Sequence, residues 1–195
     1  MRFESFKGLV EDLQLFSEGW RAFVYRAKWK AKEVAIKVAR GKEKEYAIRK
    51  EGEILELLKG YKGFPQILMS GEDFIVYEFI KGDPIERLSL SENQKRLIYL
   101  KALDLIEILD RLGINKEELH RLDKNTLVEE GFEVYLLDFE RGEKNAKKRH
   151  NLSQFLQILV REGYISRERA VELGRRYKEG HEVYHEVRKA IQGSL

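Results

Sequence analysis

Three absences narrow the class of protein that this sequence can encode. The chain of 195 residues has no cysteine, which excludes disulfides and thiolate metal sites. No apolar run approaches the roughly 18 residues of a membrane span, and charges interrupt the first twenty residues, unlike a signal peptide. Proline occurs only twice, and there is no internal repeat or low-complexity tract. We therefore expect a cytoplasmic, soluble monomer that binds no membrane.

The composition is that of a globular protein. Charged residues make up 36% of the chain and hydrophobic residues 43%, and the length is sufficient to bury a core. The net charge of +3 leans towards the basic side, which favours a polyanionic partner. Abundant lysine, glutamate and arginine with only two methionines is typical of proteins from thermophiles.

The N-terminal part is predicted to be rich in strands. Residues 1–14 suit a short amphipathic opening segment. Residues 23–38, "FVYRAKWKAKEVAIKV", alternate apolar and polar side chains, which indicates two strands joined at "KWKAKE". Helical spacing follows over 42–61, up to the glycine of "LLKGY". Residues 65–80 predict two more strands, separated by the turn signal "SGED".

A hinge is expected at "KGDPI", residues 81–85, which contains one of the two prolines. A long helix then begins after Ser91, a suitable N-cap, and stops at Gly113. The segments "NTLVEE" and "EVYLLDFE" predict a small hairpin around Gly131.

The remaining residues, 151–192, are expected to form two helical stretches. The expected breaks are near Gly163 and at Gly174 or Gly180. Strands followed by helices indicate an α+β fold. The predicted organisation is one domain, 1–195, with a strand-rich N-lobe, 1–80, and a helical C-lobe, 84–195.

A loop of small residues precedes a strand that carries a lysine. In "SEGWRAFV", Ser17, Gly19 and Ala22 would let backbone N–H groups approach phosphate oxygens closely, with Val24 beside them. Lys37 in "VAIK" lies thirteen residues after Val24 and suits contact with the phosphates of a nucleotide. We expect this lysine to be exposed in its pocket. An ordinary hairpin turn and a solvated strand lysine are the alternatives.

Three further residues add to this pattern. Glu51 lies in the predicted helix after Lys37. Asp138 ends the apolar run "VYLLD", thirteen residues after Asn125. Carboxylate and amide oxygens can hold magnesium that bridges phosphate groups, although an aspartate at a strand end can also form a simple turn.

In this order the motifs resemble the protein kinase superfamily, whose glycine-rich loop, lysine strand and Asp-Phe-Gly motif they follow. The resemblance implies ATP and Mg²⁺ as cofactors and a bilobal, kinase-like fold. Lys37 would pair with Glu51, and Asn125 and Asp138 would hold the metal. It further implies that Tyr77 borders the adenine and that the backbone of Glu78 to Ile80 reads its edge. The nucleotide-binding positions are then Ser17, Gly19, Ala22, Val24, Lys37, Tyr77, Glu78 and Ile80.

The catalytic loop departs from the family pattern. The family has its catalytic Asp five residues before the metal-binding Asn, where "EELHRLDKN" has His120. Histidine can accept a proton from a hydroxyl near neutral pH. Asp123 and Glu118 are nearby carboxylates that could serve instead. We interpret His120, Lys37, Glu51 and Asp138 as the catalytic set.

The segment after Asp138 is short and basic. Only twelve residues, "FERGEKNAKKRH", separate Asp138 from the helix expected at Asn151, so the activation segment that presents peptides in eukaryotic-type protein kinases is truncated. Clustered cations on the acceptor side would bind the phosphates of a nucleic acid, although such a run can also be a solvated loop. Residues of "RERAVELGRRYK" and Arg161 would extend the patch if they share its face. The predicted RNA contacts are Lys144, Lys147, Lys148 and Arg149.

In its small size the chain is similar to RIO kinases and to lipopolysaccharide-type and aminoglycoside-type kinases. It most resembles an archaeal family of small predicted Ser/Thr kinases, which includes the archaeal RNA kinase acting on tRNA. That resemblance implies ATP-dependent phosphorylation of a ribose 2′-hydroxyl in tRNA. The alternatives are an atypical, RIO-like protein Ser/Thr kinase and an inactive nucleotide-binding module.

Overall fold

The computed structural model describes residues 1–193, which form two compact units. The first unit comprises Met1–Lys81 together with the short segment Asp138–Arg141. The second comprises Gly82–Leu137 and the chain from Gly142 onward. Asp138 and the three residues after it therefore belong to the strand-rich unit, although most of their sequence neighbours belong to the helical one.

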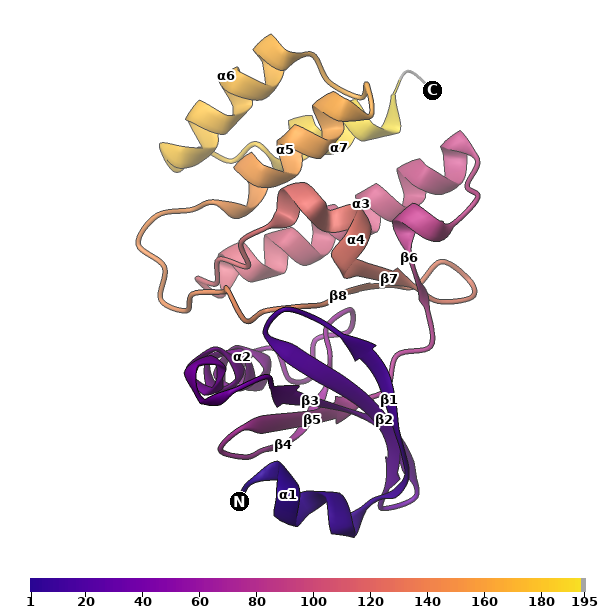
Figure 1. Cartoon of the computed structure of the whole chain (residues 1–195). Helices are drawn as coiled ribbons and strands as arrows, with labels where there is room; N and C mark the ends of the chain where they lie inside the picture. Colours follow the sequence, from indigo (N-terminus) through magenta and orange to yellow (C-terminus); the bar gives the residue numbers. More distant parts are fainter. Residues whose placement is uncertain (194–195) are drawn as a thin grey trace. The chain divides into compact units, whose positions relative to one another are not determined.

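A five-stranded antiparallel sheet forms the first unit, in the order β1-β2-β3-β5-β4 (Figure 1). Lys30 and Ala31, both with positive φ, form the two-residue turn between β2 and β3, and their twist suits a hairpin. The helices of this unit are α1 (Phe3–Phe6) and α2 (Glu45–Leu57). The strands are β1 (Glu11–Glu18), β2 (Ala22–Trp29), β3 (Lys32–Ala39), β4 (Ile67–Ser70) and β5 (Phe74–Glu78).

The first strand differs from the sequence-based expectation. Residues 1–14 were expected to form a short amphipathic segment, whereas α1 and the 3₁₀ helix Lys7–Leu9 are followed by strand β1. Only Leu13 of β1 is partly buried, and the other side chains of this edge strand are exposed. A strand that buries so little shows no alternation of apolar and polar residues, so the period of two that reveals strands is missing.

The two faces of the sheet differ in chemistry. One face carries a closely packed apolar cluster, which α1 covers with Phe3 and Phe6. Ile36 and Val38 of β3 point into that cluster. Because successive side chains of a strand alternate between faces, Lys37 lies on the opposite face.

Helix α2 packs closely against the sheet because it contains a glycine. A Cβ atom at Gly52 would lie 2.9 Å from the Ser70 hydroxyl oxygen and 3.0 Å from a methyl carbon of Ile75. Glycine costs about 1 kcal/mol relative to alanine inside a helix. Here it permits the short distance between α2 and strands β4 and β5, and Glu51 is its neighbour in the helix.

The second unit begins with β6 (Asp83–Pro84), which joins β7 (Thr126–Val128) and β8 (Val134–Leu136) in a small sheet. The expected long helix is confirmed as α3 (Glu92–Arg111). Ser91 caps it in a capping box with Gln94, and Gly113 follows its end with φ of +70°. The expected hairpin around Gly131 is confirmed as β7 and β8.

Three helices, and not two, complete this unit: α5 (Asn151–Arg161), α6 (Arg167–Lys178) and α7 (Tyr184–Gln192) (Figure 1). The breaks fall at Gly163 and Gly180, which both have positive φ, and Gly174 lies inside α6. Short 3₁₀ helices occur at Lys7–Leu9, Lys42–Lys44, Ile85–Arg87 and Leu119–Arg121. Within residues 1–193, no helix combines the length and the apolar character that crossing a membrane requires.

Candidate active site

A buried ion pair joins strand β3 to helix α2. Lys37 is 4% exposed and Glu51 is 2% exposed, and the Lys37 Nζ atom lies 2.9 Å from a carboxylate oxygen of Glu51. The predicted pairing of these two residues is therefore present in the structure. The expectation of an exposed lysine was wrong, because its side chain is enclosed by carboxylates.

Two more carboxylates reach the same ammonium group. Asp138 Oδ1 lies 3.2 Å from Lys37 Nζ, and Glu140 forms a shorter ion pair with the same atom. Asp138 has φ of +64°, a conformation that costs a non-glycine residue about 1 kcal/mol or more. This strained backbone is held by the two residues that follow it, since Phe139 is tied to the core and Glu140 to Lys37.

Phe139 anchors the Asp-Phe-Glu segment within the first unit. Its ring is fully buried and meets Phe64 edge-on, with the ring centroids 6.0 Å apart. Its backbone N–H donates a hydrogen bond to the carboxylate of Glu51. Glu51 therefore connects Lys37 with the backbone between the other two carboxylates.

The electrostatics of this cluster follow from burial and from mutual attraction. Burial lowers the pKa of Lys37, but Glu51, Asp138 and Glu140 together raise it well above its ordinary value. Burial raises the pKa of Glu51 against the lowering effect of Lys37. Within this pair the lysine remains charged, because three acidic groups face a single ammonium.

The acidic groups fit a divalent cation. Each of Glu51, Asp138 and Glu140 offers one oxygen, and these oxygens lie within 4.8 Å of one another. The side chain of Asp138 is 44% exposed, so solvent and a ligand can reach it, whereas that of Glu51 is enclosed. Carboxylate oxygens are the preferred ligands of Mg²⁺. Asp138 and Glu140 are the residues that would hold the ion, and Glu140 was not among the residues predicted from the sequence.

Three of the predicted nucleotide-binding residues, Ser17, Val24 and Tyr77, lie in register with the face of β3 that carries Lys37. Val24 of β2 lies directly opposite Lys37 of β3 in the sheet, and Ser17 of β1 lies directly opposite Val24. Tyr77 lies opposite Ala35, two residues before Lys37 on the same strand. Burial raises the pKa of the Tyr77 hydroxyl, and the Lys37 charge opposes this effect.

The loop between β1 and β2 is a closed turn. The Gly19 N–H donates to the Ala22 carbonyl at 2.9 Å, and Arg40 donates to the Gly19 carbonyl at 3.0 Å. A Cβ atom at Gly19 would meet only the Ala22 carbonyl oxygen, at 3.6 Å, so packing within the chain does not require glycine here. Trp20, at the tip of this turn, is 80% exposed.

Part of the expected adenine-binding backbone is engaged in the sheet. The Glu78 N–H donates to the Gln66 carbonyl at 3.0 Å, and the Phe79 N–H donates to the Glu33 carbonyl at 3.1 Å. These two N–H groups are therefore already hydrogen-bonded within the protein. The prediction that the backbone from Glu78 to Ile80 binds adenine now concerns only the remaining N–H and carbonyl groups, and it stays a prediction.

The loop with His120 belongs to the second unit. His120 is exposed on the 3₁₀ helix Leu119–Arg121, and Asn125 ends the one-turn helix α4 (Leu122–Asn125). Asp123, one of the alternative bases, forms an ion pair of 3.2 Å with Arg161. A metal site shared by Asn125 and Asp138 would combine residues of the two units, and it stays a prediction.

Helix α5 fixes the backbone that leads into this loop. The buried Asn151 side chain accepts from the Lys116 N–H at 2.9 Å and donates to the Ile114 carbonyl at 2.7 Å. Gln154, one turn later, accepts from the Leu119 N–H at 3.1 Å and donates to Glu117 at 2.7 Å. These contacts hold the backbone of residues 114–119 from one side.

A buried carboxylate, Asp110, completes this support. It accepts hydrogen bonds from the hydroxyls of Tyr177 and Tyr184 and from the Asn151 amide. Arg149 approaches it to 3.4 Å and lies over the Tyr177 ring, 4.2 Å from the centroid. Arg149 is therefore engaged within the protein, which reduces its availability for the predicted contact with RNA.

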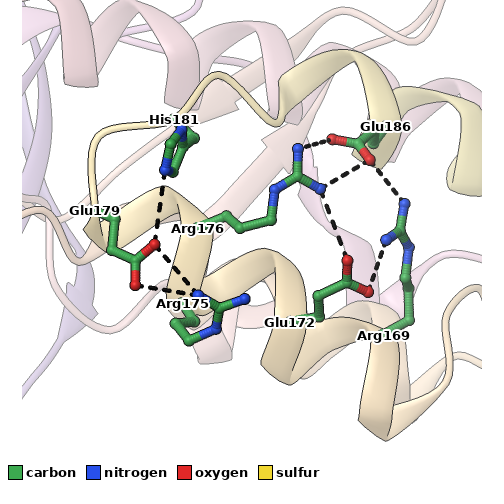
Figure 2. A network of polar contacts seen from close by, with 7 residues as sticks. All are labelled: Arg169, Glu172, Arg175, Arg176, Glu179, His181 and Glu186. Carbon is green, nitrogen blue, oxygen red and sulfur yellow. Dashed lines mark hydrogen bonds and ion pairs between the residues drawn. The ribbon is translucent and has the colours of Figure 1, made fainter.

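The other cations predicted to bind RNA fall into two groups. Lys144, Lys147 and Lys148 are exposed, and the side chains of the last two have no partner among residues 1–193. Arg169 and Arg176 of α6 are instead paired with Glu172 and Glu186, as Figure 2 shows. The arginines of α6 thus do not all share one face.

Comparison with known proteins agrees with this geometry. The sequence profile of the Phosphotransferase enzyme family matches residues 12–176, from strand β1 almost to the end of α6. The chain belongs to the Phosphotransferase enzyme family. This membership confirms the kinase-like fold that the motifs predicted.

One relative is a protein of Bacillus subtilis (strain 168) named "Putative serine/threonine-protein kinase YrzF". The two are 26% identical over 148 residues, which cover 73% of this chain and 66% of the relative. The chain thus spans just under two thirds of the length of that relative.

Proposed function

We propose that this chain transfers the terminal phosphoryl group of ATP to an alcohol hydroxyl. The observation that carries the proposal is the buried Lys37–Glu51 pair with Asp138 and Glu140 around the same ammonium. Phosphoryl transfer depends mainly on positioning and on charge stabilisation, which such a fixed constellation supplies. Bound Mg²⁺ would neutralise charge on the phosphates, held by Asp138 and Glu140.

The residues of the chain then have separate roles. Lys37 contacts the phosphates and is oriented by Glu51, while Val24 and Tyr77 line the nucleotide face of the sheet. His120, exposed on its 3₁₀ helix, takes the proton of the acceptor hydroxyl.

The acceptor that we propose first is a serine or threonine of a protein. The support is the similarity to a relative named as a protein kinase. This ranks the protein acceptor above the ribose 2′-hydroxyl of tRNA that was the leading prediction from the sequence.

A tRNA acceptor is the second candidate because a specific observation favours it. The exposed cations Lys147 and Lys148 have no partner among the described residues, and they follow Asp138 by only ten residues or fewer. Exposed lysines of this kind bind nucleic acid phosphates. The segment is also too short for the peptide platform of eukaryotic-type protein kinases.

The test is transfer of label from ATP to separate pools of total protein and total RNA. Hydrolysis to serine or threonine phosphate would support the first acceptor, and a labelled ribose would support the second. Asp138→Asn serves as the matched control for contaminating kinases. Two outcomes would overturn the proposal. Equal labelling by the wild type and this variant would mean that the protein does not transfer the label. No label in either pool despite ATP binding would leave an inactive nucleotide-binding module.

A further inference from the structure

Helices α5 and α6 enclose a groove of about 900 Å³ that the proposed phosphotransfer does not use. It lies entirely within the second unit and runs along α6 from Arg167 to Lys178. The twelve residues of α6 span about 18 Å. The volume is in the range of ligand-binding pockets, and the length matches a helix of about three turns.

The floor and walls of the groove are mainly apolar. Leu156 and Val160 of α5 face Ala170 and Val171 of α6. Val171 is 68% exposed, on a helix that also carries seven charged residues. Residues 153, 156, 157 and 160 of α5 follow the spacing i, i+3, i+4, i+7, so a continuous stripe of this helix lines the groove.

A buried hydroxyl in the lining lacks a partner. The Ser153 Oγ atom is inaccessible to solvent and makes no hydrogen bond within residues 1–193. A buried polar group without a partner costs about 1–3 kcal/mol. Gly174 lies across from it, and a Cβ atom there would be 4.0 Å from this oxygen. The wall of the groove therefore covers a polar atom that nothing in the described chain satisfies.

The rim of the groove is cationic. Arg167 and Lys178, at the two ends of α6, have no ion-pair partner in the part of the chain that the structure describes. Arg175, between them, is paired with Glu179 at 3.1 Å, and Glu179 is the single acidic residue of the lining. Figure 2 shows this pair apart from the network of Arg169 and Arg176, whose charges are already balanced by glutamates.

We propose that the α5–α6 groove binds an acidic amphipathic helix of a partner protein. Apolar side chains of that helix would cover Leu156, Val160 and Val171, and its carboxylates would meet Arg167 and Lys178. This is the helix-in-groove mode of recognition, in which apolar anchors give affinity and charges give orientation. No aromatic side chain is among the described residues of the lining, so the groove lacks the stacking platforms that single-stranded nucleic acids use.

The proposal does not rest on phosphotransfer, because the binding can be measured without ATP. A displayed library of random 16-residue peptides is selected against the full chain, and the enriched peptide is synthesised with a fluorescent label. We expect the enriched sequences to combine leucine, isoleucine or phenylalanine at helical spacing with an excess of aspartate and glutamate. Binding is then followed by fluorescence anisotropy.

Two variants test the groove. Arg167→Glu/Lys178→Glu reverses the free charges of the rim, and Val171→Glu places a charge on the apolar wall. Each should weaken binding of the peptide by about tenfold or more. Lys59→Glu/Lys189→Glu is the matched control, since it makes the same change in net charge at exposed lysines outside the groove. It should alter the affinity less than about twofold.

Several outcomes would overturn the proposal. These are selection of basic or purely polar peptides, a selected peptide that binds both groove variants as well as the wild type, or no enriched peptide at all. A dimer in light scattering that Val171→Glu dissociates would assign the groove to a second copy of the chain. Loss of RNA binding in the same variants, with the peptide unaffected, would assign it to nucleic acid.

Discussion

Replacing Lys37 with methionine should destabilise the protein as well as inactivate it. The change leaves Glu51, which is 2% exposed, without its counter-charge in the interior. Removing one partner of a buried ion pair typically costs about 3–5 kcal/mol. For a chain of this size, each kcal/mol corresponds to about 2–4 °C in the melting temperature. We therefore expect the variant to melt about 10 °C below the wild type at pH 8.

The loss should depend on pH in a defined direction. Burial already raises the pKa of Glu51 above its ordinary 4.5, and Lys37 opposes that rise. Without Lys37 the pKa of Glu51 rises further. A carboxyl whose pKa is raised by folding stabilises below its unfolded pKa and loses this contribution as the pH rises through the folded value. The deficit of Lys37→Met should thus be largest at alkaline pH and shrink as the pH falls towards 4.5.

A double variant distinguishes two causes of the lost stability: an unpaired charge on Glu51 and the loss of the lysine side chain itself. In Lys37→Met/Glu51→Gln no charge remains uncompensated, and the amide oxygen can still accept the Phe139 N–H. Replacing both members of a buried pair by neutral groups is often close to neutral for stability. We expect the double variant to recover at least half of the loss while remaining inactive. Calorimetry from pH 5 to pH 9 measures all three proteins.

Two results would refute this reasoning. If Lys37→Met melts within about 2 °C of the wild type at pH 8, the ion pair contributes little and Lys37 is not held as the structure indicates. If Glu51→Gln fails to restore stability to Lys37→Met, the cost arises from lost packing and not from an unpaired carboxylate.

Three shorter predictions concern the other carboxylates. Asp138→Asn should abolish magnesium-dependent turnover, because an amide is a poor substitute for a charged ligand; normal turnover at ordinary Mg²⁺ concentrations would contradict its assignment. Glu140→Gln should raise the Mg²⁺ concentration required for half-maximal turnover, measured by titration, and an unchanged requirement would exclude Glu140 as a ligand. Asp110→Ala should lower the free energy of unfolding in urea by about 3 kcal/mol, since it leaves buried hydroxyls of Tyr177 and Tyr184 unpaired; a loss below about 1 kcal/mol would show that these groups find other partners.

Much of the fold was predictable because its signals are local. Alternating residues identify β2 and β3, and Ser91 with Gly113 delimits α3. In these elements the large apolar side chains gather on one face, so their periodicity appears in the sequence. Strand β1 was missed for the opposite reason, since its side chains are almost all exposed. The helix break at Gly180 could not be distinguished from Gly174, because the sequence does not reveal which glycine has positive φ.

The candidate site was predictable only in part. The order of Lys37, Glu51 and Asp138 along the chain was sufficient to pair them, and the structure brings the three together. The burial of Lys37 was not predictable, since Glu51, Asp138 and Glu140 gather around the ammonium from distant parts of the chain. Arg149 likewise appeared to be a free cation, because its partner Asp110 lies 39 residues earlier in the chain.

The one-residue difference at position 140 changes the charge balance of the site. In Asp-Phe-Gly the third residue has no side chain, whereas here Glu140 adds a third carboxylate around Lys37. Three carboxylates against one ammonium leave two excess negative charges when all are ionised, which is the charge that one divalent cation would neutralise. The phenylalanine between them is buried and fixes the backbone, so Asp138 and Glu140 can reach the ammonium from either side of this anchor. The substitution is therefore better understood as a carboxylate added beside Lys37 than as the loss of a flexible glycine.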